Sequence, residues 1–367
     1  MIQNNKPEYL YLHVPFCKTI CSYCDFCHTV YQTDAADQWL DALAKEIQAK
    51  QINPNLKTIY IGGGTPTSLS YAQLDQLLTM LDPFSKQVQE YTVEINPETL
   101  DDAKAELLCM HGINRVSLGF QTSSPTLLKT LGRHHTILQV QQTMECLHRH
   151  GITNLSLDLM YSLPGQTMAD LQQSVQDALA CSPAHLSLYS LTIEENTVFG
   201  RKGYQHLDED TEADMYEWIC QALPQAGYHQ YEISNFALEG RESMHNKAYW
   251  DYRDFYGISI GASGKEGFLR YDHTRNLAEY LKEPTAIQEI PLSKEDAMFE
   301  MVMMGLRLKR GLDLRLFADT FDTSFYAVYG AKADALIAKG LLEKDESYCW
   351  ASQRGFEILN SVLVDLM

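Results

Sequence analysis

Four cysteines lie close together near the start of the chain, in the stretch YLYLHVPFCKTICSYCDFC (residues 9–27). Cys17, Cys21 and Cys24 follow the spacing C-x3-C-x2-C, and Cys27 comes three residues later. The apolar and aromatic residues before them predict a strand that breaks into a loop. Thiolates on one loop can all turn towards a single metal centre, which helical or strand spacing would not allow. This stretch is therefore predicted to bind a metal.

Two other interpretations of the cysteines stay open: a four-cysteine zinc site that includes Cys27, and cysteines that are simply small buried side chains. The uneven spacing argues against zinc, because zinc modules usually combine two C-x2-C pairs from separate turns. With Tyr23 before the third cysteine and Phe26 after it, the spacing resembles the signature of the radical-SAM superfamily. The resemblance implies that the first three cysteines hold a [4Fe-4S] cluster, whose fourth iron is left open for S-adenosylmethionine (SAM).

Composition and charge narrow the possible functions. The 367 residues exceed a typical single core, so a barrel domain with one small appended domain is expected. The formal net charge of −19 argues against nucleic-acid binding, which needs clustered Lys and Arg, and any anionic ligand must be held locally. The sequence has no apolar run of about 18 residues and no signal-peptide pattern at its start, so a cytoplasmic location is expected.

Six strand-and-helix units follow one another along the first half of the chain. A parallel sheet needs such crossover helices between its strands, and a doubly wound open sheet would fit this alternation as well. Polar residues gather at the carboxyl ends of the predicted strands, which favours an incomplete (β/α)6 TIM-like barrel of the radical-SAM type. The strands are expected in the stretches that begin at residues 9, 56, 89, 114, 154 and 185, with the third ending at Glu94, the fourth at Gln121 and Asp158 within or near the end of the fifth.

The regular alternation fades after about residue 201. An acidic helix and an irregular, aromatic-rich stretch follow, and the last 75 or so residues predict three helices, a short strand pair and a final helix. This order suggests a winged-helix-like α+β domain, but its helices lack the basic face that DNA binding requires. The expected division is a core barrel over residues 1–235, an irregular segment packing on it over 236–290, and a C-terminal domain over 291–367.

The predicted strand ends carry residues that suit a small charged ligand. Three glycines at residues 62–64 would let the backbone approach a ligand closely. Glu94 and Asp158, taken singly, fit strand caps or arginine partners equally well. Together with Gln121 and Arg133 at one barrel mouth, they would suit a zwitterion with a ribose, because carboxylates bind ammonium and hydroxyl groups while a guanidinium binds a carboxylate.

Seven motifs occur in order along the chain: YLYLHVPFCKTICSYCDF, IYIGGGTPT, TVEINPET, VSLGFQTSSPTLLKTLGRHH, LSLDLMYSLPGQT, EISNFA and HNKAYW. Together they resemble the oxygen-independent coproporphyrinogen III oxidase-like family of radical-SAM proteins, and within it the haem chaperone branch. The resemblance covers most of the chain, including the C-terminal domain. It implies a chaperone that binds a [4Fe-4S] cluster and SAM, carries haem as cargo and transfers it to an acceptor protein, with any membrane contact peripheral and made through that acceptor. The SAM contacts that it implies are Tyr11, Gly63, Gly64, Thr65, Glu94, Gln121, Arg133 and Asp158.

Two positions bear on the choice within the family. In the oxidase the cysteine motif continues as C-x-C, whereas Phe26 stands two residues after Cys24, as in the chaperone branch. Cys27 is therefore expected not to bind the cluster, and coproporphyrinogen III oxidase activity is not expected. Ser263 stands at a position where the branch often has a histidine. Any role of that histidine in handling a ligand is therefore not expected in this chain.

His245, in the segment HNKAYW, is the candidate haem ligand. By residue type alone, such a histidine is more often part of a packed loop than a ligand. The resemblance implies the opposite, because the corresponding motif of the branch is associated with haem binding: His245 would be an axial ligand, with Tyr249 and Trp250 packed on the macrocycle. The alternative functions are a radical enzyme that acts on a tetrapyrrole or a methyl acceptor and, more remotely, a zinc-stabilised binding module.

Overall fold

The computed structural model describes residues 6–367 and is built around one nine-stranded sheet. The strand order is β11-β1-β4-β5-β6-β7-β8-β10-β9. Six of these strands run parallel in chain order, and their β-branched and aliphatic residues make them buried on both faces. They are β1 (Tyr9–Val14), β4 (Thr58–Gly63), β5 (Glu90–Ile95), β6 (Arg115–Gln121), β7 (Asn154–Tyr161) and β8 (His185–Ser190).

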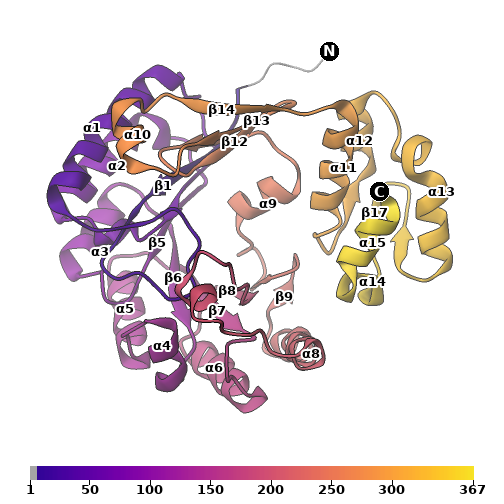
Figure 1. The fold of residues 1–367 in the computed structure, drawn as a ribbon, viewed down its shortest axis with the longest axis horizontal. Coiled ribbons are helices and arrows are strands. Elements are labelled where there is room, and N and C mark those ends of the chain that lie inside the picture. The colour runs from indigo at the N-terminus through magenta and orange to yellow at the C-terminus, as the bar shows by residue number, and fades with distance from the viewer. Residues whose placement is uncertain (1–5) are drawn as a thin grey trace.

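Helices connect the parallel strands and lie along the outer side of the sheet (Figure 1). Serine, threonine or aspartate side chains cap the N-termini of five of the six connecting helices. Over residues 6–367, β8 does not pair back onto β1, so the barrel is open; the predicted incomplete (β/α)6 barrel is confirmed. The helices are α1 (Thr33–Lys50), α2 (Tyr71–Ser85), α3 (Asp102–Met110), α4 (Pro125–Leu131), α5 (Ile137–Arg149) and α6 (Met168–Ala180).

Later segments extend the sheet at both edges. The short strand β11 (Tyr256–Ile258) adds to β1 in parallel, while β10 (Asn235–Ala237) and β9 (His229–Gln230) add to β8 in antiparallel fashion. The acidic helix expected after residue 201 is α8 (Glu209–Gln225), with its buried apolar residues against the main core. Three short elements complete the loops near the strand ends: β2 (Phe16–Cys17) paired with β3 (Thr29–Val30), the 3-10 turn η1 (Pro66–Ser68) and α7 (Val198–Arg201).

The segment 236–290 is more ordered than the sequence suggests. It contains α9 (Met244–Trp250), α10 (Leu277–Lys282) and the first two strands of a separate three-stranded sheet, β12 (Ser263–Glu266) and β13 (Leu269–His273), which β14 (Ile287–Pro291) completes. These strands are only four or five residues long and include glycines and charges. Pieces this short give no readable period, which explains why the segment was expected to be irregular.

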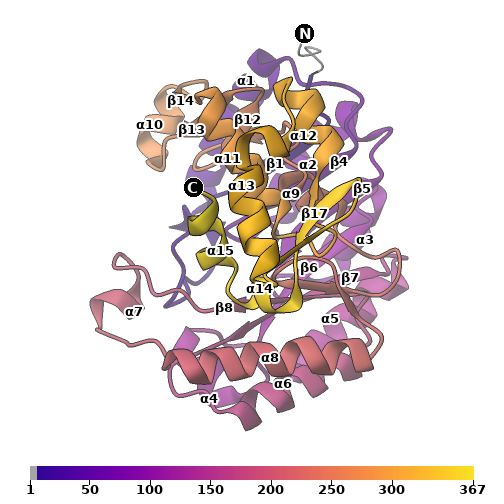
Figure 2. The same cartoon turned by 90° about the vertical axis from the view of Figure 1, so that its right-hand side faces the viewer.

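The C-terminal region has its own apolar core, made mainly from helices (Figure 2). Three helices, a strand pair and a final helical stretch follow in the predicted order, so a winged-helix-like domain is confirmed in outline; the exact domain boundaries stay a prediction. Within residues 6–367, no helix combines the length and apolar character that a membrane crossing needs. The elements are α11 (Lys294–Gly305), β15 (Leu312–Asp313), α12 (Leu314–Phe321), α13 (Phe325–Ala338), β16 (Leu342–Lys344), β17 (Tyr348–Ala351), α14 (Gln353–Glu357) and α15 (Leu359–Leu366).

Candidate functional site

A cavity of about 510 Å3, here called the strand-end cavity, opens at the carboxyl ends of the parallel strands. This is the edge at which parallel α/β proteins usually bind ligands. Its walls come from the cysteine loop, the glycine turn after β4 and the ends of β5 to β8. It brings together ten of the twelve predicted site residues: Cys17, Cys21, Cys24, Gly63, Gly64, Thr65, Glu94, Gln121, Arg133 and Asp158.

The cysteine loop is fixed by backbone hydrogen bonds to distant segments. The Ser22 N–H donates to the carbonyl of Leu131, and the carbonyl of Ser22 accepts from the Phe199 N–H at 3.0 Å. Burial raises the pKa of the Cys17 thiol to about 11 and that of Cys24 to about 12. A cationic iron centre would offset this cost and stabilise the thiolates.

The spacing of the sulfur atoms suits a cluster better than one zinc ion. In residues 6–367, the only three candidate metal ligands whose donor atoms all lie within 4.8 Å of one another are Asp102, Cys146 and His150. The sulfur atoms of Cys17, Cys21 and Cys24 therefore do not all lie within 4.8 Å of one another. Four sulfurs around one zinc ion, with ~2.3 Å bonds, would lie only ~3.8 Å apart. Three free cysteines on one cavity wall fit a group as large as a [4Fe-4S] cluster.

The glycine turn after β4 must approach the cysteine loop closely. A Cβ atom on Gly64 would lie 2.7 Å from the carbonyl oxygen of Phe16 and 3.0 Å from the Cys17 sulfur, so no larger residue fits. Gly63 has φ +105°, a backbone conformation that favours glycine. Its N–H donates to the carboxylate of Glu94 at 3.0 Å. The glycines thus join the cysteine loop to the end of β5.

Glu94 lies at the end of β5 with its carboxylate held from two sides. The Tyr60 hydroxyl donates to it at 2.7 Å, in addition to the Gly63 N–H. Burial raises the pKa of the Glu94 carboxyl to about 7, although the hydrogen bond from Tyr60 opposes the shift. A ligand ammonium in the cavity would favour the ionised form.

Asp158, on β7, is the second buried carboxylate in the cavity wall. Ser117 donates to its two oxygens at 2.9 and 2.8 Å, and Ser156 donates at 3.2 Å. Burial raises its pKa, while the serine hydrogen bonds oppose the shift. Both carboxylates are therefore oriented before any ligand arrives.

Arg133 and Gln121 supply the polar groups of the opposite wall. The pairing of β6 with β7 is irregular between Gly119 and Gln121, and Gln121 itself has φ +61°. The guanidinium of Arg133 packs against Gly119, where a Cβ atom would lie 2.6 Å from it. Its Nε is buried and has no hydrogen-bond partner anywhere in residues 6–367. A buried guanidinium in a cavity wall with one unpaired N–H is suited to receive a ligand carboxylate.

Sequence reasoning missed several polar residues of this cavity. Asn96 follows Glu94 at strand spacing and donates from Nδ2 to the Thr65 hydroxyl at 2.9 Å. Tyr60 and Ser117 hold the two carboxylates. The period-two alternation of strands could have identified all three, because each lies on the same face as a predicted site residue on its own or the neighbouring strand.

A second cavity of about 620 Å3, here called the aromatic cavity, adjoins the first. Asp25 and Phe26 line both cavities, so the end of the cysteine loop separates them. Cys27 lines only the aromatic cavity, with its thiol 3.5 Å from the carbonyl of Arg275. Tyr11 also lines the aromatic cavity rather than the strand-end cavity, its hydroxyl pairs with His13 Nδ1 at 2.9 Å, and its ring lies 6.1 Å from that of Tyr60; its contact with SAM stays a prediction.

His245 lines neither cavity and is 1% exposed. Its Nδ1 pairs with the Thr58 hydroxyl at 2.6 Å, its Nε2 pairs with the Tyr249 hydroxyl at 2.8 Å, and its ring stacks on Tyr60 with 5.1 Å between ring centroids. Burial lowers the pKa of the imidazole to about 3, so it is neutral. Coordination of haem iron would require one of these two hydrogen bonds to break; the axial role stays a prediction.

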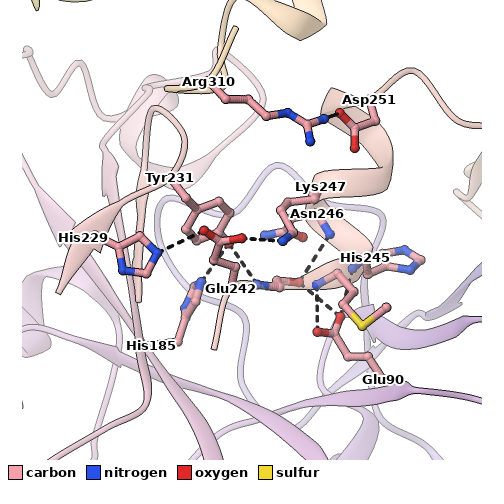
Figure 3. A network of polar contacts seen from close by, with 12 residues as sticks. Glu90, His185, His229, Tyr231, Glu242, His245, Asn246, Lys247, Asp251 and Arg310 are labelled. Carbon is pink, nitrogen blue, oxygen red and sulfur yellow. Dashed lines mark hydrogen bonds and ion pairs between the residues drawn. The ribbon is translucent and has the colours of Figure 1, made fainter. Parts of the chain in front are cut away.

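The helix α9, which carries His245, is anchored at both ends (Figure 3). At its start, the buried carboxylate of Glu90 on β5 accepts hydrogen bonds from the N–H groups of Met244 at 2.8 Å and His245 at 2.9 Å. At its end, Asp251 forms an ion pair with Arg310. The helix therefore presents its last turn to the aromatic cavity from a fixed position.

Comparison with known proteins identifies two domain families in the chain. A model of the Radical SAM superfamily matches residues 11–178, and a model of the HemN C-terminal domain matches residues 292–358. Among solved structures, coproporphyrinogen III oxidase (HemN) from Escherichia coli, described as a radical SAM enzyme, covers 98% of this chain and 90% of its own with a TM-score of 0.84. At 22% sequence identity, this likeness concerns the fold alone.

Similarity in sequence extends over whole chains. Heme chaperone HemW from Lactococcus lactis subsp. lactis (strain IL1403) is 42% identical, and the alignment covers 97% of this chain and 96% of that protein. Heme chaperone HemW from Bacillus subtilis (strain 168) is 38% identical over 96% of this chain and 97% of its own length. The protein of the same name from Escherichia coli (strain K12) is 32% identical over 97% of both chains.

Proposed function

This chain belongs to the heme chaperone HemW family, and from that premise we propose that it binds haem and transfers it to an acceptor protein, on a scaffold that also binds a [4Fe-4S] cluster and SAM. The single observation that carries the proposal is the pair of adjoining cavities. One is lined by the three cysteines and seven of the eight predicted SAM contacts, and the other adjoins it and is lined by aromatic and charged side chains.

The strand-end cavity supports the cofactor part of the proposal. Its three cysteines would hold the cluster, which supplies one-electron redox chemistry when bound. The guanidinium of Arg133, whose Nε is unpaired, would bind the carboxylate of SAM, and Glu94 would bind its ammonium group. Asp158 would accept hydrogen bonds from ribose hydroxyls. These roles follow from the charge and hydrogen-bonding capacity of each group.

The aromatic cavity supports the cargo part. A flat, largely apolar macrocycle needs a pocket with apolar surface in its walls. The volume of the aromatic cavity, about 620 Å3, lies within the ~300–1,000 Å3 usual for cofactor sites. Because this space shares only Asp25 and Phe26 with the lining of the strand-end cavity, we infer that cargo and SAM can be bound together. Holding haem and SAM in separate cavities suits a chaperone, which stores its cargo unchanged. An oxidase must instead bring its substrate against the SAM that reacts with it.

The test is anaerobic purification and cluster reconstitution, followed by haem titration and two activity assays. We expect saturable haem binding, release of haem to haem-depleted host membranes faster than to apomyoglobin as a passive trap, and no conversion of coproporphyrinogen III. Robust protoporphyrinogen formation accompanied by 5′-deoxyadenosine would overturn the proposal in favour of a tetrapyrrole-modifying enzyme.

A further inference from the structure

The aromatic cavity concentrates positive charge in a strongly acidic protein. The chain has a formal net charge of −19, yet this one cavity is lined by two carboxylates, Asp25 and Asp272, and by four cations. The cations come from the segments that enclose the cavity after α9, on β12 and on or after β13. They are Arg253, Lys265, Arg270 and Arg275.

Two of these four cations are already paired within the protein. Lys265 lies 2.7 Å from the Asp254 carboxylate and is nearly buried, and Arg270 lies 2.9 Å from the Glu300 carboxylate. Their charges are therefore neutralised locally, and they serve to hold the cavity wall together.

The other two cations are available to a ligand. Arg253 is exposed and has no ion-pair partner within 4.0 Å in the described part of the chain. Arg275 donates to the backbone carbonyl of Asp25, while its guanidinium lies 3.9 Å from the carboxylate of the same residue, at the outer limit of an ion pair. The Arg275 side chain is 61% exposed, so water screens this pair. A desolvated anionic ligand would be a stronger partner for both arginines.

Aromatic rings make up much of the remaining wall. Tyr249 and Phe255 pack edge to face with 4.6 Å between their ring centroids, and Phe26 is 67% exposed on the cysteine loop. The indole N–H of Trp250 is buried and has no acceptor among residues 6–367. Rings in this number suit a flat aromatic ligand, and an unsatisfied N–H in the same wall suits one that also carries oxygen acceptors.

We propose that haem lies in the aromatic cavity with its two propionates bound by Arg253 and Arg275. The proposal rests on the haem binding proposed above and adds where the cargo lies and which side chains recognise it. The two arginines belong to separate segments of the cavity lining, one shortly after α9 and one after β13. Two separated cations match the two carboxylates of the macrocycle, and recognition of this kind does not depend on His245.

The experiment is a haem titration of the reconstituted protein, followed by Soret absorbance, on the wild type and the variants Arg253→Ala and Arg275→Ala and their combination. Arg354→Ala is the matched control, because this arginine of α14 is exposed and has no ion-pair partner among residues 6–367. Each cavity variant is expected to bind haem about 10-fold more weakly and the double variant about 100-fold, because each loses a charge-assisted hydrogen bond. Iron content should match the wild type in every variant.

A second ligand isolates the propionates. Haem dimethyl ester, in which both propionates are methylated, should bind the wild type about as weakly as haem binds the double variant, and the arginine substitutions should leave its affinity unchanged. Haem affinity equal to that of the wild type in both Arg253→Ala and Arg275→Ala would overturn this inference and leave the proposed function in place. So would an affinity that Arg354→Ala reduces by the same factor as the cavity variants. Failure of the wild type to bind haem at all would instead overturn the proposed function.

Discussion

The carboxylate of Glu90 accepts a hydrogen bond from the backbone N–H of His245 at 2.9 Å, so that a side chain of β5 holds the first turn of α9. The same carboxylate also accepts from the N–H of Met244 and the hydroxyl of Ser243. Glu90 is 4% exposed. One buried acid therefore determines where the helix that lines the aromatic cavity begins.

Replacing Glu90 with alanine should lower the free energy of unfolding by about 3–5 kcal/mol, because three donors lose their acceptor and the buried guanidinium of Arg115 loses a nearby negative charge. Urea unfolding of the cofactor-free protein measures the effect. Glu289→Ala, at an exposed glutamate of β14, is the control and should change stability by less than about 0.5 kcal/mol. Equal stability of both variants would show that Glu90 does not anchor α9.

Serine variants of the four clustered cysteines should divide into two classes. Cys17→Ser, Cys21→Ser and Cys24→Ser should each lose most of the bound iron, because these residues share the strand-end cavity, whereas Cys27→Ser should retain it because Cys27 lines the other cavity. Iron and sulfide per chain after reconstitution are the measurement. Full loss of iron in Cys27→Ser would contradict the three-cysteine assignment.

SAM binding should depend on pH through Glu94. Burial raises the pKa of this carboxyl to about 7, so it changes from mostly protonated at pH 6 to mostly ionised at pH 8. Because the ligand ammonium binds the carboxylate form, affinity should rise roughly 10-fold from pH 6 to pH 8 and level off above that. Calorimetric titration should show this slope in the wild type and a weaker, pH-independent affinity in Glu94→Gln. A wild-type affinity that does not vary with pH would exclude Glu94 as the ammonium partner.

Substituting His245 with alanine should lower the free energy of unfolding by about 2–4 kcal/mol, because a buried ring that stacks on Tyr60 and forms two hydrogen bonds is removed. The two possible roles of His245, axial ligand and structural residue, predict different Soret bands for the haem complex of the variant. Both ring nitrogens are engaged in the haem-free protein, so the axial role predicted for His245 requires one hydrogen bond to break; in that case the Soret band of the haem complex shifts in His245→Ala, whereas loss of a purely structural residue leaves the band in place. His206→Ala, at an exposed histidine, is the control. A shifted Soret band at wild-type stability would instead establish coordination by His245.

The sequence predicted the strand-end cavity well because a parallel sheet imposes its geometry. Glu94, Gln121 and Asp158 each lie at or near the end of a strand, and such ends meet at one edge whatever the details of packing. The cysteine loop directly follows β1, so it must lie at the same edge of the sheet. Local pattern and global topology agree for these residues, so their convergence could be predicted.

The aromatic cavity could not be predicted in this way. Tyr11 is predicted among the SAM contacts and also lines this cavity, most of whose lining comes from residues 249–275, which have no readable period and reach β1 only through tertiary contacts. Arg253 and Arg275 lie in connections between elements and belong to none of the motifs. His245 stands out by type and motif, yet only the packed structure reveals that both its nitrogens are already satisfied.

The pairing of β1 with β11 has a consequence for how the chain folds. One side of β1 pairs with β4, which follows soon after it, but the other side pairs through Leu10 with Tyr256, near the far end of the core. While the chain is being synthesised, that side of the first strand stays an open edge until residues 256–258 have emerged. Open edges invite pairing with other chains, and contacts this remote in sequence slow folding. A protein shortened before Tyr256 should therefore aggregate, even though all its cysteine ligands and nearly all of the parallel sheet are present.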